Sequence, residues 1–259
     1  METSKIGAMF SYFLKREMTD RYLGNVMGLA WVFIQPLITL VIYSFVFENI
    51  FKARIPEAAH LGFAVYLAIG FWPWTAFAES LLRSTTAVID KKSLLGKVKL
   101  DLRLPVAATI TASFILHMLG YIVVLIALAL WGKPLHFEML PLIVPALMIL
   151  YLLALGFGFL LAAVQVYLRD TAQIMASVLM LWFFATPVIY SKSLLPETVR
   201  QWLFLNPVYP AIDFIHQALL FGTNLPWLSL LSSGLFAVGL LWMSLRVFNR
   251  LSTRFEDFI

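Results

Sequence analysis

Few side chains in this sequence could do chemistry within its long apolar segments. Glu79 and Arg83 stand four residues apart, so on a helix they would share a face and could form an ion pair. Asp213 and His216 stand three residues apart, which favours a hydrogen-bonded structural pair over a proton relay. His117 is a further ionisable group within an apolar segment. Ion-coupled carriers usually place more such groups on their spans, so the pattern disfavours a proton- or sodium-driven carrier.

Motifs for nucleotide hydrolysis, metal binding and acyl transfer are missing from the sequence. Gly96-Lys97 lacks the glycine five residues upstream and the following Ser or Thr of a phosphate-binding loop. There is no H-E-x-x-H, no G-x-S-x-G and no cysteine. We therefore expect that this chain is not an enzyme and holds neither a metal nor a cofactor.

The composition indicates a protein whose outer surface is lipid. Of the 259 residues, 61% are hydrophobic and 13% are charged, whereas a soluble domain carries about 25% charged residues. The net charge of +5 comes from basic residues in short loops between apolar runs. That placement fits membrane topology better than nucleic-acid binding.

The uncharged apolar runs predict an all-α membrane protein with six transmembrane helices in a single domain, residues 1–259. A helical span needs about 20 mostly apolar residues. Residues 194–222 are too short and too interrupted by proline for two more spans, so we expect an outer-side re-entrant helical hairpin there. The six predicted spans are residues 29–47, 61–78, 104–132, 139–168, 171–191 and 226–245.

The distribution of Lys and Arg predicts the orientation. With six spans, one side of the membrane receives 14 of these residues and the other side receives 5. Because cytoplasmic loops carry the excess of basic residues, both termini are expected in the cytoplasm.

Residues 1–28 predict an amphipathic helix that lies in the membrane interface. Apolar side chains recur there at helical spacing, while Lys15 and Arg16 occupy other faces. The helix could be a simple anchor or could have a functional role. Its apolar positions are Ile6, Met9, Phe10, Phe13, Leu14, Met18, Tyr22 and Val26.

Two cytoplasmic segments could contact a soluble partner. The loop 83–103 combines basic and apolar side chains and is longer than topology requires, although it could also touch only lipid headgroups. The turn Arg169-Asp170 is either a plain tight turn or a second contact.

Aromatic side chains are abundant, with 22 Phe, 9 Tyr and 8 Trp. Those at span ends fit an interfacial belt, but Trp182-Phe183-Phe184 lies deeper in the fifth run. Aromatic faces pack against the C–H faces of sugars, so a pore lined with rings could pass a sugar chain. We expect Tyr43, Trp182, Phe183, Phe184 and Tyr190 to line such a channel; the alternative is that these rings face lipid.

Several motifs resemble, in order and spacing, those of ATP-binding-cassette exporter permeases of the polysaccharide type. The first is Arg21-Tyr22-Leu23-Gly24-Asn25-Val26-Met27-Gly28-Leu29-Ala30-Trp31, followed by Pro36. Asn25 and Met27 replace the usual Ser and Leu of that segment. The others are Arg169-Asp170, Pro187-Val188-Ile189-Tyr190, and Leu205-Asn206-Pro207 with Pro210. The resemblance covers essentially the whole chain.

The resemblance implies a homodimer in the bacterial inner membrane with two copies of a separate ATPase subunit that binds ATP and Mg. The implied substrate is a polysaccharide linked to undecaprenyl diphosphate, such as O-antigen, capsule or teichoic acid, and no nucleic acid is implied. Two alternatives remain: the same architecture exporting a lipid or drug, and a channel or scaffold without an ATPase.

The resemblance also implies roles for particular residues. Headgroup binding where the lipid diphosphate enters is expected of Arg16, Arg21, Tyr22 and Trp31, because an arginine fork matches phosphate oxygens. Coupling to the ATPase is expected of Arg83, Lys91, Lys92, Leu94, Leu95, Lys97, Arg169 and Asp170.

Overall fold

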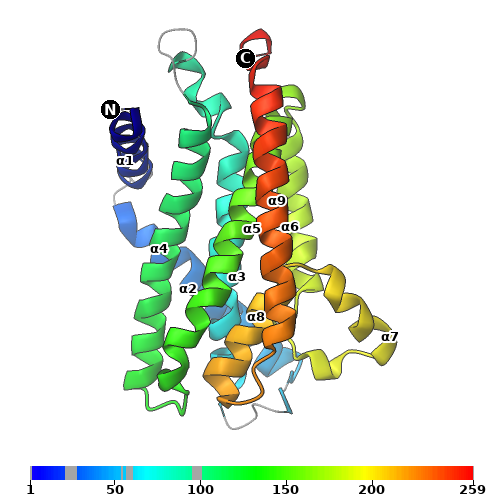
Figure 1. Ribbon diagram of the computed structural model, residues 1–259. Helices are drawn as coiled ribbons and strands as arrows, with labels where there is room; N and C mark the ends of the chain where they lie inside the picture. Colours follow the sequence, from blue (N-terminus) through cyan, green and yellow to red (C-terminus); the bar gives the residue numbers. More distant parts are fainter. Residues whose placement is uncertain (1, 21–27, 54, 57–60, 95–100, 259) are drawn as a thin grey trace.

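The computed structural model describes residues 2–20, 28–53, 55–56, 61–94 and 101–258. The described residues form helices joined by short turns, and the long helices run side by side in a bundle (Figure 1). The longer helices are α1 (Glu2–Asp20), α2 (Trp31–Phe45), α3 (Phe63–Thr86), α4 (Arg103–Leu130), α5 (Leu140–Tyr167), α6 (Thr171–Ala185) and α9 (Trp227–Ser252). The shorter ones are α7 (Glu197–Arg200) and α8 (Tyr209–His216). The expected all-α fold is confirmed.

Among the described residues, four helical stretches are long and apolar enough to cross a membrane. They are Phe33–Ile50, Arg103–Leu130, Phe137–Tyr167 and Trp227–Ser252, and α6 is a shorter apolar helix. The chain is therefore a multi-pass membrane protein. The full count of six spans stays a prediction, since α3 carries Glu79 and Arg83 and α6 has only 15 residues.

The core of the bundle is built on α3 and α5. Trp72, Phe77 and Leu67 of α3 are completely buried. Small residues of α5 let its neighbours approach closely. A Cβ at Gly156 would come within 2.8 Å of Leu240 Cγ on α9, and one at Gly158 within 2.7 Å of a side-chain oxygen of α3.

The outward side of α9 carries large apolar side chains that the rest of the described chain does not cover. Leu228, Leu235 and Trp242 are all exposed. A soluble protein rarely leaves a patch of this kind in water, whereas in a bilayer lipid tails cover it.

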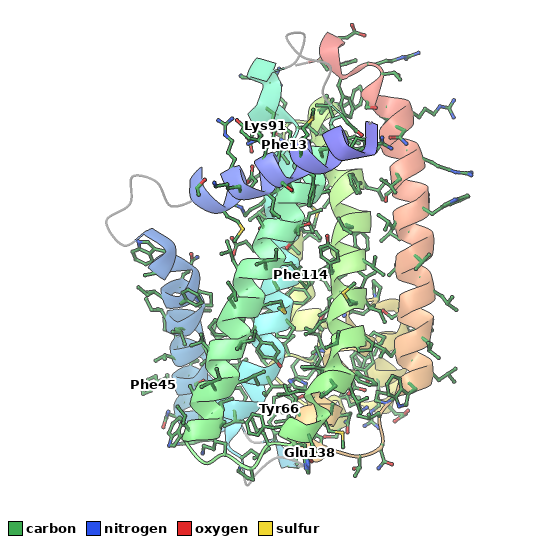
Figure 2. All side chains as sticks on the ribbon, turned by 60° about the vertical axis from the view of Figure 1, so that its left-hand side comes forward. Phe13, Phe45, Tyr66, Lys91, Phe114 and Glu138 are labelled. Atoms are coloured by element: carbon green, nitrogen blue, oxygen red, sulfur yellow. The ribbon has the colours of Figure 1, made fainter. Side chains whose placement is uncertain are left out.

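The first helix does not run along the bundle. Figure 2 shows that α1 lies across the ends of the long helices, near the end of the bundle that holds the C-terminus. Phe13 is 2% exposed and packs against Leu104 and Ala108 of α4. Residues 2–20 of the predicted segment are therefore helical, with the apolar side of α1 turned toward α4; residues 21–27 lie outside the described residues, and the interfacial position stays a prediction.

The segment predicted as a re-entrant hairpin consists of short helices with different surroundings. In α8, Ile212, Phe214 and Ile215 are fully buried within the bundle. The short helix α7 projects to one side (Figure 1), and Trp202 and Phe204 after it are exposed. Burial of α8 in protein is compatible with a re-entrant segment, and the re-entrant hairpin itself stays a prediction.

Candidate translocation face and coupling contacts

The inner side of α1 is joined to the basic segment after α3 by a carboxylate. Glu17 Oε1 accepts a hydrogen bond from Lys91 Nζ at 3.0 Å, and its other oxygen lies 3.9 Å from an Arg83 guanidinium nitrogen. Lys91 belongs to a 3-10 helix, Ile89–Leu94, that directly follows α3. Figure 2 shows Lys91 beside α1, at the same end of the molecule as Phe13.

These contacts change the expectations for the loop 83–103. The side chain of Lys91 is only 13% exposed, and Val88 is completely buried, so neither is openly presented to a partner. The predicted ion pair between Glu79 and Arg83 is wrong, since Arg83 lies against Glu17 and Glu79 lies against a residue of α4. Sequence spacing did not single out Glu17, because its partners are remote in the chain.

The two ends of the predicted loop are helical. Arg83 lies in the last turn of α3 and Arg103 begins α4. Arg103 forms a salt bridge of 2.7 Å with Asp101, and this side-chain hydrogen bond holds the pKa of the Asp101 carboxyl below its usual value. Lys92, which follows Lys91 in the chain, is exposed.

Of the other residues expected to bind headgroups or the ATPase, some are exposed and some lie outside the described residues. Arg16 is exposed on α1, where its guanidinium donates to the Tyr12 hydroxyl at 3.4 Å, and Trp31 is exposed at the start of α2. The predictions for Arg21, Tyr22, Leu95, Lys97 and the side chain of Leu94 lie outside the described residues.

The turn between α5 and α6 presents Arg169 and Asp170 to the exterior. Gln165, which is buried, braces this turn from inside. Its amide donates to the Arg169 carbonyl at 2.8 Å and accepts from the Ala172 N–H at 2.8 Å. The turn is thus ordered by a residue whose role its sequence position did not reveal, and the contact of the turn with a partner stays a prediction.

Three of the five predicted channel aromatics meet at one cavity. Tyr43 of α2 stacks on Phe183 of α6 with ring centroids 5.7 Å apart, and Phe184 lies 5.4 Å from Phe183. Phe71 and Trp74 of α3 also contact Phe183, with centroids at 6.1 Å and 5.8 Å. The cavity measures about 280 Å³ and is lined by Tyr43, Phe71, Trp74, Thr75, Ala78, Glu79, Leu179, Met180, Phe183 and Phe184. We call it the α2–α3–α6 cavity.

The other two predicted channel aromatics do not line this cavity. Trp182 points toward the bundle, where its ring meets Phe77 and Phe157 edge-on and its Nε1 donates to Asn206 Oδ1 at 2.9 Å. Tyr190 donates its hydroxyl hydrogen to the Phe184 carbonyl at 2.8 Å. Trp182 therefore packs within the bundle, and Tyr190 anchors the end of α6.

A carboxylate and an imidazole meet at the middle of the bundle. Glu79 Oε2 contacts His117 Nε2, and the side chains are 33% and 1% exposed. His117 stands close to the midpoint of α4. Spacing along the chain could not reveal this contact, because the two residues lie on different helices.

The predicted pair Asp213–His216 is wrong, because each residue has another partner. Asp213 Oδ2 accepts from Lys192 Nζ at 2.8 Å, and His216 Nε2 contacts the Tyr66 carbonyl at 3.2 Å. These groups line a second cavity of about 230 Å³, at the end of the bundle remote from α1. The ion pair ties the loop after α6 to α8, so its role is structural.

Comparison with known proteins decides the family. The sequence profile described as "ABC-2 type transporter" matches residues 9–220. The chain belongs to the ABC-2 type transporter family.

Several named proteins are similar to this chain over nearly its whole length. The O-antigen export system permease protein RfbA of Myxococcus xanthus is 29% identical over 252 residues, which cover 95% of this chain and 93% of that protein. The protein of the same name from Klebsiella pneumoniae is 24% identical, with 94% and 92% covered. The polysialic acid transport protein KpsM of Escherichia coli is 23% identical, with 90% of each chain covered.

One of the motifs that carried the family resemblance has a clear structural role in this ABC-2 chain. Asn206 accepts from Trp182 Nε1 and donates to the Thr186 hydroxyl at 2.8 Å. It therefore fastens the segment before α8 to the end of α6. The motif Leu205-Asn206-Pro207 therefore stabilises the fold of this chain.

Proposed function

We propose that this chain is the membrane permease subunit of an ATP-driven exporter that moves a lipid-linked polysaccharide out of the cytoplasm. The observation that supports this proposal most strongly is the similarity, over 95% of the chain, to a protein named an O-antigen export permease. The similarity to a polysialic acid transport protein supports the same class of cargo. Undecaprenyl diphosphate is the lipid carrier that we propose for the glycan.

The proposed topology has six spans, α2, α3, α4, α5, α6 and α9, in the bacterial inner membrane. With 24 residues, α3 is about 36 Å long, which exceeds the hydrocarbon thickness of about 30 Å. Both termini lie toward one end of the bundle in Figure 1, as an even number of spans requires. The excess of basic residues places that end in the cytoplasm, with the segment 194–222 at the outer side.

The proposed assembly is a homodimer of this chain with two copies of a separate ATPase, which binds ATP and Mg. The ATPase would dock against the exposed Lys92 and the turn Arg169-Asp170. Since Glu17 joins α1 to Lys91, movement of that docking segment would also move α1. The lipid diphosphate would enter near Arg16 and Trp31, with Arg21 and Tyr22 between them in sequence.

The proposal is tested by co-expressing the chain with a candidate ATP-binding-cassette ATPase from the same organism. We expect the two proteins to copurify and the complex to carry lipid-linked glycan. Lys92→Glu with Arg169→Glu should weaken copurification by about tenfold, because charges at a docking surface set partner affinity. Copurification with a lipid or drug in place of glycan would favour the alternative cargo, and no copurified ATPase would favour a channel or scaffold.

A further inference from the structure

An ionisable side chain reaches a surface of the bundle beside the midpoint of α4. Glu79 contacts His117, which is 1% exposed and lies near the midpoint of α4. The side chain of Glu79 is 33% exposed. Glu79 also lines the α2–α3–α6 cavity, so its exposed part faces that cavity.

The position of Glu79 distinguishes two faces of the molecule. An ionisable group at this depth faces water or protein, since exposure to lipid tails is costly. The groove between α4 and α5 is different, because apolar and aromatic side chains such as Ile122, Leu125 and Val144 line it. The groove suits lipid, whereas the α2–α3–α6 cavity suits an aqueous path.

The chemistry of the cavity fits a sugar. Tyr43 and Phe183 stack on each other, so the ring surface that remains in the cavity wall is what can pack on the C–H faces of a pyranose. A carboxylate accepts short, charge-assisted hydrogen bonds from hydroxyl groups.

We propose that Glu79, held by His117, is the hydroxyl-binding residue of a sugar subsite formed with Tyr43, Phe71, Trp74 and Phe183, and that the face made by α2, α3 and α6 therefore lines the export path. This inference rests on the proposed function. To that function the inference adds a polar residue that binds the glycan. It also identifies the side of the bundle that faces the glycan during export.

The absence of cysteine from the chain allows a direct test of this face, because an introduced cysteine is the sole thiol of the permease. Ala78→Cys places it in the cavity wall, and Val123→Cys places the control on the exposed side of α4. The permease with its ATPase, in vesicles, is treated with a membrane-impermeant thiosulfonate. We expect Ala78→Cys to react at least about tenfold faster than Val123→Cys, because the thiolate forms in water and not in lipid. Equal rates would overturn the inference, since the face would then lie in lipid or under a second copy.

The ligand is tested with lipid-linked polysaccharide isolated from cells whose exporter ATPase is inactive. We expect this glycan to slow the labelling of Ala78→Cys. Glu79→Leu should lower export by about tenfold or more at equal amounts of complex, and Glu79→Gln, which keeps hydrogen-bonding capacity, should lower it less. If Glu79→Leu complexes fail to assemble, export by Glu79→Gln and the labelling of Ala78→Cys test the subsite instead.

The outcomes separate the subsite from the function on which it rests. A wild-type complex that does not export glycan would contradict the proposed function. Export by the wild type, together with unchanged export by both Glu79 variants and no protection of Ala78→Cys, would overturn the subsite alone.

Discussion

At the scale of single residues, Glu17 is the side chain that connects the interfacial helix to the basic segment after α3. Its pair with Lys91 is largely shielded from water, so loss of one partner should cost about 1–3 kcal/mol. Glu17→Lys should therefore lower the thermal stability of the permease and the stimulation of the ATPase. The double variant Glu17→Lys with Lys91→Glu restores the attraction between these two positions and should recover part of both, because Arg83 then meets a cation at position 17. A double variant as impaired as the single one would show that the pair does not connect these elements.

Gln165 gives a second prediction at this scale. Gln165→Leu removes two hydrogen bonds from the turn Arg169-Asp170 and leaves backbone groups without that partner. The expected loss is about 1–3 kcal/mol of stability, measured by thermal unfolding, together with weaker ATPase stimulation. The matched control is Gln173→Leu, at an exposed position of α6, which should change little. Equal effects of the two variants would refute the bracing role.

Individual contacts were the hardest feature to predict from sequence. Spacing along one helix predicted Glu79–Arg83 and Asp213–His216, and both pairs are wrong. Intrahelical spacing says which groups share a face, but a partner on another helix can replace the local one. His117 for Glu79 is a partner of this kind, supplied only by packing.

At the scale of helices, the close approach of α5 to its neighbours depends on small residues. Gly156→Leu would place its side chain against Leu240 of α9 and force the two helices apart. We expect a loss of about 1–3 kcal/mol or failure to accumulate, measured by thermal unfolding in detergent. The control Gly239→Leu has open space around its Cβ and should be tolerated. Comparable destabilisation by both would mean that close packing at Gly156 is not important.

Helices were predicted well wherever an uncharged apolar run defined them. The runs 104–132 and 139–168 correspond to α4 and α5 within one or two residues at each end. By contrast, α6 ends at Ala185 although its apolar run continues to 191. Pro187 explains the difference, because it disfavours helical backbone at Thr186, which is extended. Hydropathy detects apolar length, but proline determines where the helix stops.

At the scale of the whole molecule, the proposed topology places the two ends of the bundle on opposite sides of the membrane. Figure 2 shows Lys91 and Glu138 at these opposite ends. Lys92→Cys should react with an impermeant reagent in inside-out vesicles, and Glu138→Cys in right-side-out vesicles. Labelling of both from one side would contradict the topology. Sequence predicted this arrangement from loop charge, while the choice of pore-facing side needed the three-dimensional position of Glu79.

Transport itself tests the central claim most directly. The permease and its ATPase are placed in proteoliposomes with the ATPase outside, and lipid-linked polysaccharide is supplied in the outer leaflet. Protection of the glycan from an added glycosidase is then followed over time. The account predicts that protection rises when ATP and Mg are added and stays at background without ATP or without the ATPase. Protection that is the same with and without ATP would contradict it.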